Sequence, residues 1–160
     1  MEHGMISGHG TGTDYDALGQ DLKVISEDAA HRISILSNAS ALIWEALEDI
    51  NWCGFYLMHE GRLILGPFQG KIACTVIEPG KGVCGTAVKR NETVLVKDVH
   101  TFDGHIACDS ASNSEIVVPI HRNGEIWGVL DIDSPLFARF DEKDRTGLES
   151  VARVLEELLR

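Results

Sequence analysis

The chain has 160 residues, a formal net charge of -11 and ordinary apolar and charged fractions, so its size suits one domain with a sizeable core. Its basic residues form no long cluster, which argues against a nucleic-acid partner and against docking on an anionic membrane. No apolar run approaches the roughly 20 residues of a membrane span and no signal-peptide pattern follows the start, so we expect a cytoplasmic protein.

The N-terminal segment is rich in Gly, His and Ser and shows no periodicity. We therefore expect residues 1–13 to be a disordered tail and residues 14–160 to form a single domain. Apolar side chains at helical spacing predict a first helix over residues 14–27. They predict a second, longer helix that Asp28 caps and that ends near Asn51.

Aromatic and β-branched segments bounded by turn residues predict six strands in the middle of the chain. We expect these strands at residues 52–58, 62–65, 71–77, 93–96, 115–120 and 125–132. A short helix is predicted over residues 83–90, and Asp141 is expected to cap a final helix. This order predicts an α+β fold, in which helices pack on a central antiparallel six-stranded sheet.

Cys108 is the first candidate for chemistry. It lies in a long segment without periodicity, residues 98–114, with His105 shortly before it and Asp109 directly after it. Loops on a rigid scaffold often carry functional side chains. A cysteine becomes reactive as the thiolate, which positive charge or N–H donors stabilise. Cys108 is therefore a candidate nucleophile, and a loop cysteine without a role is the alternative interpretation.

The other three cysteines differ in their surroundings. With no secretory signal we expect a reducing compartment without permanent disulfides, which leaves core packing, metal binding or redox chemistry as roles for the thiols. Cys74 lies on a predicted strand. Cys84 opens the predicted short helix, whose dipole is expected to lower the pKa of its thiol. Either one is a candidate to condense with a sulfenic acid on Cys108, although small buried hydrophobes are the alternative. Cys53, among strand aromatics, is expected to be packed core.

Three carboxylates are expected to gather at one end of a hairpin. Glu115 begins one strand, and Asp131 and Asp133 lie near the end of the strand that an Asn-Gly turn pairs with it. Like charges so close should raise at least one pKa, which favours a proton donor and an anionic site for an ammonium group. Trp52 and Tyr56 share a strand face and suit an apolar wall. The alternatives are a solvated strand end and ordinary core packing.

Two other patterns are weak. His100, His105 and Cys108 carry zinc-ligand side chains, but their spacing matches no common structural zinc site. The Gly-rich run at residues 80–85 lacks the phosphate-loop pattern. We therefore expect no metal site.

The chain resembles the free methionine-(R)-sulfoxide reductases, which are stand-alone GAF-domain enzymes, over nearly its whole length beyond the tail. The segments that carry this resemblance are residues 51–56, 65–71, 82–87, 104–115 and 128–134. The resemblance implies a GAF-like sheet and reduction of free L-methionine (R)-S-oxide to L-methionine. The rival interpretations are a non-catalytic GAF module that binds a small ligand and a redox-sensing GAF module.

The resemblance also implies roles for three cysteines. Cys108 would be the nucleophile that becomes a sulfenic acid, and Cys74 and Cys84 would be the other two redox cysteines, their order left open. The resulting intramolecular disulfide would be recycled by thioredoxin and its NADPH-dependent reductase, with no cofactor bound to the chain. A homodimer is expected.

The resemblance further places the carboxylates and aromatics around the substrate. Glu115, Asp131 and Asp133 would surround the sulfoxide and the amino group, with Glu115 and Asp133 as the candidates for a catalytic role and the proton donor left open. Trp52 and Tyr56 would contact the methyl group. The substrate carboxylate is expected to meet backbone N–H groups of the Cys108 loop.

Overall fold

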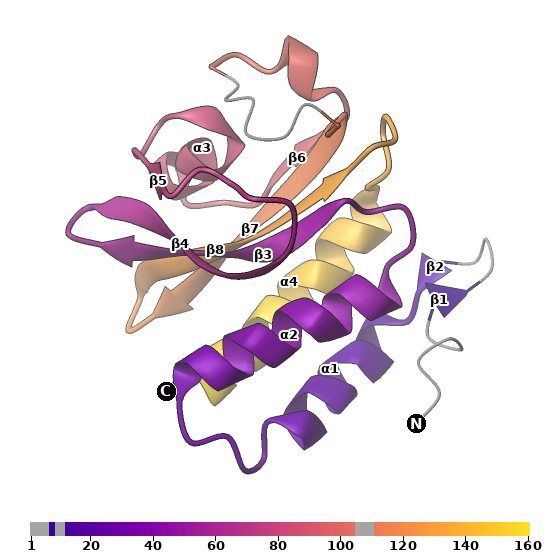
Figure 1. Ribbon diagram of the computed structural model, residues 1–160, viewed down its shortest axis with the longest axis vertical. Helices are drawn as coiled ribbons and strands as arrows, with labels where there is room; N and C mark the ends of the chain where they lie inside the picture. The colour runs from indigo at the N-terminus through magenta and orange to yellow at the C-terminus, as the bar shows by residue number, and fades with distance from the viewer. Residues whose placement is uncertain (1–6, 9–11, 105–110) are drawn as a thin grey trace.

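The structure is a computed structural model that describes residues 7–8, 12–104 and 111–160 (Figure 1). The expected tail falls largely outside the described residues and stays a prediction, as does the single domain. The helices are α1 (Tyr15–Ile25), α2 (Arg32–Ala46), α3 (Gly82–Arg90) and α4 (Glu142–Leu158). The strands are β1 (Ser7–Gly8), β2 (Gly12–Thr13), β3 (Trp52–His59), β4 (Arg62–Gly70), β5 (Val76–Ile77), β6 (Val94–Val96), β7 (Ser114–Arg122) and β8 (Glu125–Ser134).

The predicted α+β fold is confirmed. Six strands form one antiparallel sheet in the order β5-β4-β3-β8-β7-β6, which places β3 and β8 at its centre. Helices α1, α2 and α4 cover one face, and α3 lies on the other (Figure 1). Among the described residues, no helix is both long enough and apolar enough to span a membrane.

The two sheet faces have different contents because side chains alternate along each strand. Cys53 and Phe55 of β3 point into the larger core under α1, α2 and α4. Trp52 and Tyr56 of the same strand belong to the smaller cluster under α3. The predicted core position of Cys53 and the shared face of the two aromatics are therefore confirmed, and the α3 face is left to build a pocket.

Two predicted strand boundaries are wrong. The strand expected at 71–77 shrinks to β5, so Cys74 lies in a loop, not on a strand. Strand β4 does not stop at Pro67 but runs on to Gly70. The register shifts between Gly54 and Tyr56 of β3, where β4 has one extra residue. This bulge accommodates Pro67, which has no N–H to donate to the neighbouring strand.

The helix ends follow local capping chemistry. Helix α2 begins at Arg32 rather than near Asp28, because the His31 ring nitrogen Nδ1 accepts a hydrogen bond of 3.1 Å from the backbone N–H of Ile33. Asp141 caps α4 as predicted and forms a reciprocal capping box with Asp144. Side-chain acceptors thus satisfy backbone N–H groups in the first turns of α2 and α4.

Gly54 should be intolerant of any side chain. A Cβ added there would lie 2.2 Å from the Cβ of Phe68 and 2.9 Å from the carbonyl oxygen of Pro67. We expect Gly54→Ala to lower the free energy of unfolding by about 1–3 kcal/mol, measured by urea denaturation. Gly19→Ala is the matched control, since its methyl would meet only Val154 Cγ2 at 3.5 Å, and it should be neutral or stabilising. An unchanged midpoint for Gly54→Ala would show that the bulge relaxes.

Candidate active site

A small pocket that opens to solvent lies on the α3 face of the sheet. Its walls come from β3, β7, β8, the start of α3 and the loop before β5. The lining residues are Trp52, Tyr56, Ile72, Ala73, Ile77, Lys81, Gly82, Val83, Cys84, Ser112, Glu115, Asp131 and Asp133. Five predicted substrate-binding residues therefore reach one cavity, although their roles are still predictions.

The aromatic wall is tied to the loop that carries Cys74. The ring of Trp52 stacks on Tyr56 with centroids 5.8 Å apart and on Phe68 at 5.1 Å. The Trp52 indole N–H donates to the carbonyl of Lys71 at 3.1 Å, and the Tyr56 hydroxyl donates to the carbonyl of Cys74 at 2.9 Å. The apolar wall and the loop therefore form one hydrogen-bonded unit.

The three carboxyl groups meet because of strand register. Glu115 of β7 pairs directly with Asp133 of β8, and Asp131 lies two residues along the same face. Glu115 is 9% exposed and Asp131 is 5% exposed. The Ser112 hydroxyl donates to Asp133 Oδ2 at 3.2 Å. The predicted gathering of carboxylates is thus present, and it is buried rather than solvated.

Burial changes the protonation of this cluster. Burial, together with the charges of Asp131 and Asp133, raises the pKa of Glu115 well above its usual range. Burial and the charge of Asp131 likewise raise the pKa of Asp133. Burial also raises the pKa of Asp131, although hydrogen bonds from Glu115, Cys84 and Asp133 oppose it. The site can therefore hold a carboxylic acid near neutral pH beside an ionised neighbour.

The cysteines divide into two groups. Cys74 is disulfide-bonded, whereas Cys53 and Cys84 are free and buried. The prediction that the α3 dipole lowers the pKa of Cys84 is wrong. Burial, and then the charges of Asp131 and Glu115, raise it well above its usual range, because desolvation outweighs a helix terminus. The candidate nucleophile Cys108 lies outside the described residues.

Sequence reasoning missed two polar pocket residues, Ser112 and Lys81. Ser112 joins the cluster through Asp133 and also accepts a hydrogen bond of 3.2 Å from the Asn51 side-chain amide. Lys81, directly before α3, lines the mouth and is the one cation among the described lining residues. Its place before a Gly-rich helix start was the available signal. Of the weak zinc pattern, His100 contacts the Asn113 side chain at 2.8 Å, and the other two residues lie outside the described ranges.

The carboxyl cluster should make the folded protein less stable as the pH rises. Because the folded-state pKa of Glu115 is raised, its stabilising contribution is complete below the unfolded pKa of about 4.3 and is lost as the pH rises through the folded pKa. Glu115→Gln should therefore raise Tm at pH 8 relative to native protein more than at pH 4.5, by roughly 2–4 °C for each 1 kcal/mol gained. Exposed Glu125→Gln is the control. A gain that is equal at both pH values would contradict the burial argument.

The comparisons with known proteins agree with this geometry. The sequence profile of the GAF domain matches residues 21–159. The chain is 52% identical over 145 residues to the free methionine-R-sulfoxide reductase of Escherichia coli, covering 91% of this chain and 88% of that protein. It superposes with a TM-score of 0.87 on fRMsr of Staphylococcus aureus in complex with substrate, at 52% identity and with 92% and 96% of the two chains covered.

A second structural relative is the free methionine-R-sulfoxide reductase of Neisseria meningitidis in complex with its substrate. It superposes with a TM-score of 0.87 at 41% identity, and the match covers 91% of this chain and 87% of that one. Identity of this level over nearly the whole length extends the resemblance from motifs to the full fold. The chain belongs to the GAF-domain family and, within it, to the free methionine-R-sulfoxide reductases.

Proposed function

We propose that this protein reduces free L-methionine (R)-S-oxide to L-methionine through a Cys108 sulfenic acid. The observation that carries the proposal is the pocket itself, in which buried Glu115 and Asp131 face an aromatic wall of Trp52 and Tyr56. A small zwitterion with an apolar methyl group matches that combination of charge and shape. The relatives named above as reductases of this substrate support the same choice.

Each part of the substrate has a partner in the pocket. The ammonium group would pair with the carboxylates of Asp131 and Asp133, and the methyl group would pack on Trp52 and Tyr56. Lys81 at the mouth gives the substrate carboxylate a cationic partner, beside the backbone N–H groups expected from the Cys108 loop. A methionine sulfoxide within a polypeptide has neither a free ammonium nor a free carboxylate, so it should be a poor substrate.

The chemistry needs a nucleophile and an acid. The Cys108 thiolate attacks the sulfoxide sulfur while a protonated carboxyl, Glu115 or Asp133, gives a proton to the sulfoxide oxygen. The oxygen passes to the cysteine sulfur, so methionine leaves reduced by two electrons and Cys108 remains as a sulfenic acid. The raised pKa of both carboxyls supports the acid role, because each keeps its proton at higher pH.

The described residues on either side of Cys108 support its approach to the pocket. Gly104 accepts a hydrogen bond of 3.0 Å through its carbonyl from the N–H of Gly82, which lines the pocket. Ser112 lines the pocket on the other side. Cys108 lies midway between Gly104 and Ser112, and a chain covers about 3.3–3.6 Å per residue at most. Both described flanks of the segment that carries Cys108 therefore reach the pocket, which supports Cys108 as the proposed nucleophile.

We further propose that Cys74 resolves the sulfenic acid before Cys84 does. Cys74 is disulfide-bonded whereas Cys84 is free, which supports Cys74 as the first of the two to form a disulfide in the catalytic cycle. The raised pKa of Cys84 makes it a poor thiolate. Condensation of the Cys74 thiol with the sulfenic acid forms the disulfide and releases water. An external dithiol, thioredoxin recycled by its NADPH-dependent reductase, would then restore both thiols. The homodimer stays a prediction.

The function is tested by a single turnover of the fully reduced protein. With free L-methionine (R)-S-oxide in excess and no reductant, we expect about one methionine per chain, and none from the (R)-sulfoxide held within a peptide. Cys108→Ser should give no methionine, since it has no thiolate to attack. Ligand binding without any methionine from the native protein would indicate the non-catalytic GAF module instead. Normal yield from Cys108→Ser would remove Cys108 as nucleophile.

The resolving step is tested by continuous turnover with the thioredoxin system. Cys74→Ser should still give its first methionine but then stall, because the sulfenic acid finds no resolving thiol, and dimedone should trap it. Cys53→Ala is the matched control, since Cys53 is buried on the opposite sheet face, and it should keep cycling. Sustained cycling by Cys74→Ser would transfer the role to Cys84.

A further inference from the structure

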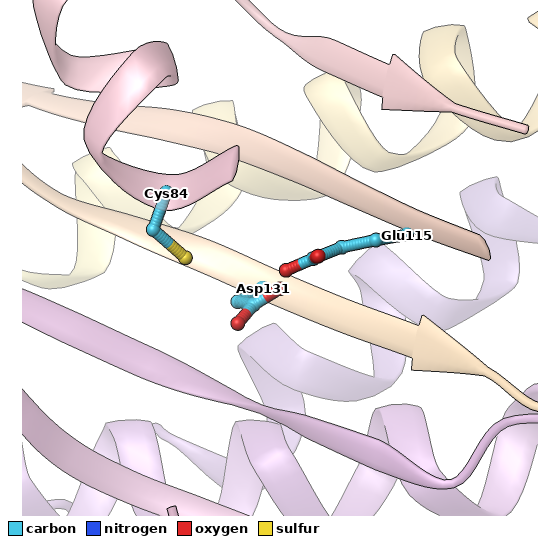
Figure 2. Close-up of side chains that lie close together, drawn as sticks. All are labelled: Cys84, Glu115 and Asp131. Carbon is cyan, nitrogen blue, oxygen red and sulfur yellow. The ribbon is translucent and has the colours of Figure 1, made fainter. Parts of the chain in front are cut away.

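We propose that Cys84, Glu115 and Asp131 form a binding site for a thiophilic divalent cation such as Zn²⁺ or Cd²⁺ on the floor of the pocket. The three side chains come from α3, β7 and β8, and their ends point toward one another (Figure 2). The proposal rests on this geometry and not on the reductase activity. Only its consequence for catalysis, given below, depends on the proposed function.

The spacing of the donor atoms suits one ion. The Cys84 sulfur and one carboxylate oxygen from each of Glu115 and Asp131 all lie within 4.8 Å of one another. Zinc binds sulfur at about 2.3 Å and carboxylate oxygen at about 2.0–2.2 Å, so two of its ligand atoms lie at most about 4.5 Å apart. Small rotations of the carboxyl groups therefore bring all three donors to one centre.

An unsatisfied buried oxygen points independently to a ligand. Asp131 is 5% exposed and lines the pocket, yet its Oδ1 has no hydrogen-bond partner. A buried carboxylate oxygen without a partner is costly, and a cation satisfies it more fully than a neutral donor does. Oδ1 of the neighbouring Asp133 is also buried without a partner. Two carboxylate oxygens at the pocket floor are thus buried without a hydrogen-bond partner.

The donor set selects the class of cation. Mg²⁺ and Ca²⁺ prefer oxygen ligands throughout, whereas a thiolate with two carboxylates suits a softer ion. Three protein ligands leave a fourth position for water, and the pocket connects that position to solvent. A divalent cation would also offset the repulsion between the buried carboxylates of Glu115 and Asp131.

The site would make the protein sensitive to such ions. If Glu115 and Asp131 serve the substrate as proposed above, an ion bound to them occupies the place of the substrate ammonium. Zn²⁺ should then raise KM for free methionine sulfoxide without lowering kcat at saturating substrate. An unchanged KM under saturating Zn²⁺ would overturn this overlap.

The site itself is tested without substrate, in the full chain carrying Cys74→Ser and Cys108→Ser, which leaves Cys53 and Cys84 as its thiols. Titration with CdCl₂ should give the ultraviolet sulfur-to-cadmium charge-transfer band, saturating at one ion per chain. Adding Cys84→Ser should abolish the band, and adding Asp131→Asn should weaken binding by about tenfold or more. Adding Cys53→Ala, on the opposite sheet face, should leave the band intact.

A band that survives Cys84→Ser, a band lost with Cys53→Ala, or no band at millimolar cadmium would overturn the proposal. Alkylation provides a measurement that needs no substitution at the site. Cd²⁺ should slow the reaction of Cys84 with N-ethylmaleimide, mapped by mass spectrometry, and an unchanged rate would also contradict the site. Because no sulfoxide is present, a missing band rejects the metal site alone, and a missing single turnover rejects the reductase alone.

Discussion

The register of β7 against β8 is the constraint on which the rest of the site depends. It sets Glu115 opposite Asp133 and leaves Asp131 on the same face, two residues away. On an exposed strand, each carboxyl group would be solvated and would keep an ordinary pKa. Under α3 the three are desolvated together, which raises the pKa of each. The cluster therefore lowers the stability of the fold when its carboxyl groups are ionised. Groups with strongly shifted pKa values are typical of functional sites.

Packing on the opposite face of the sheet fixes the strand register that holds the carboxyl groups together. Helices α1, α2 and α4 bury the alternate side chains of the same strands, so β7 and β8 cannot slip by one residue without exposing that core. Gly54, paired with Asp131, packs against Phe68 with no room for a side chain. Rigid packing on one side thus holds charged groups in place on the other, where solvent alone would separate them.

The pocket also connects substrate recognition to the redox loop. Trp52 and Tyr56 form an apolar wall, and both donate hydrogen bonds to the loop that carries Cys74. A substrate packed on these rings would lie beside the segment proposed to resolve the sulfenic acid. The carboxyl groups also have more than one possible use. They can donate a proton, pair with an ammonium group or, together with Cys84, bind a soft cation. One pocket can serve these uses because its three carboxyl groups outnumber Lys81, the one cation among its described lining residues.

The sequence alone determined much of this protein. Local periodicity and turn residues predict most elements and the α+β class, and the Asn-Gly turn brings Glu115 to the aspartates, because these signals involve near neighbours in the chain. Tertiary structure decided what depends on distant contacts. A bulge against β3 lets β4 continue through Pro67 to Gly70. Cys74 lies in a loop, where its carbonyl accepts a hydrogen bond from the Tyr56 hydroxyl. Burial, and then the charges of Asp131 and Glu115, raise the pKa of Cys84, against the expected direction. Desolvation depends on which distant segments pack around a group, so it cannot be predicted from the neighbouring residues in the sequence.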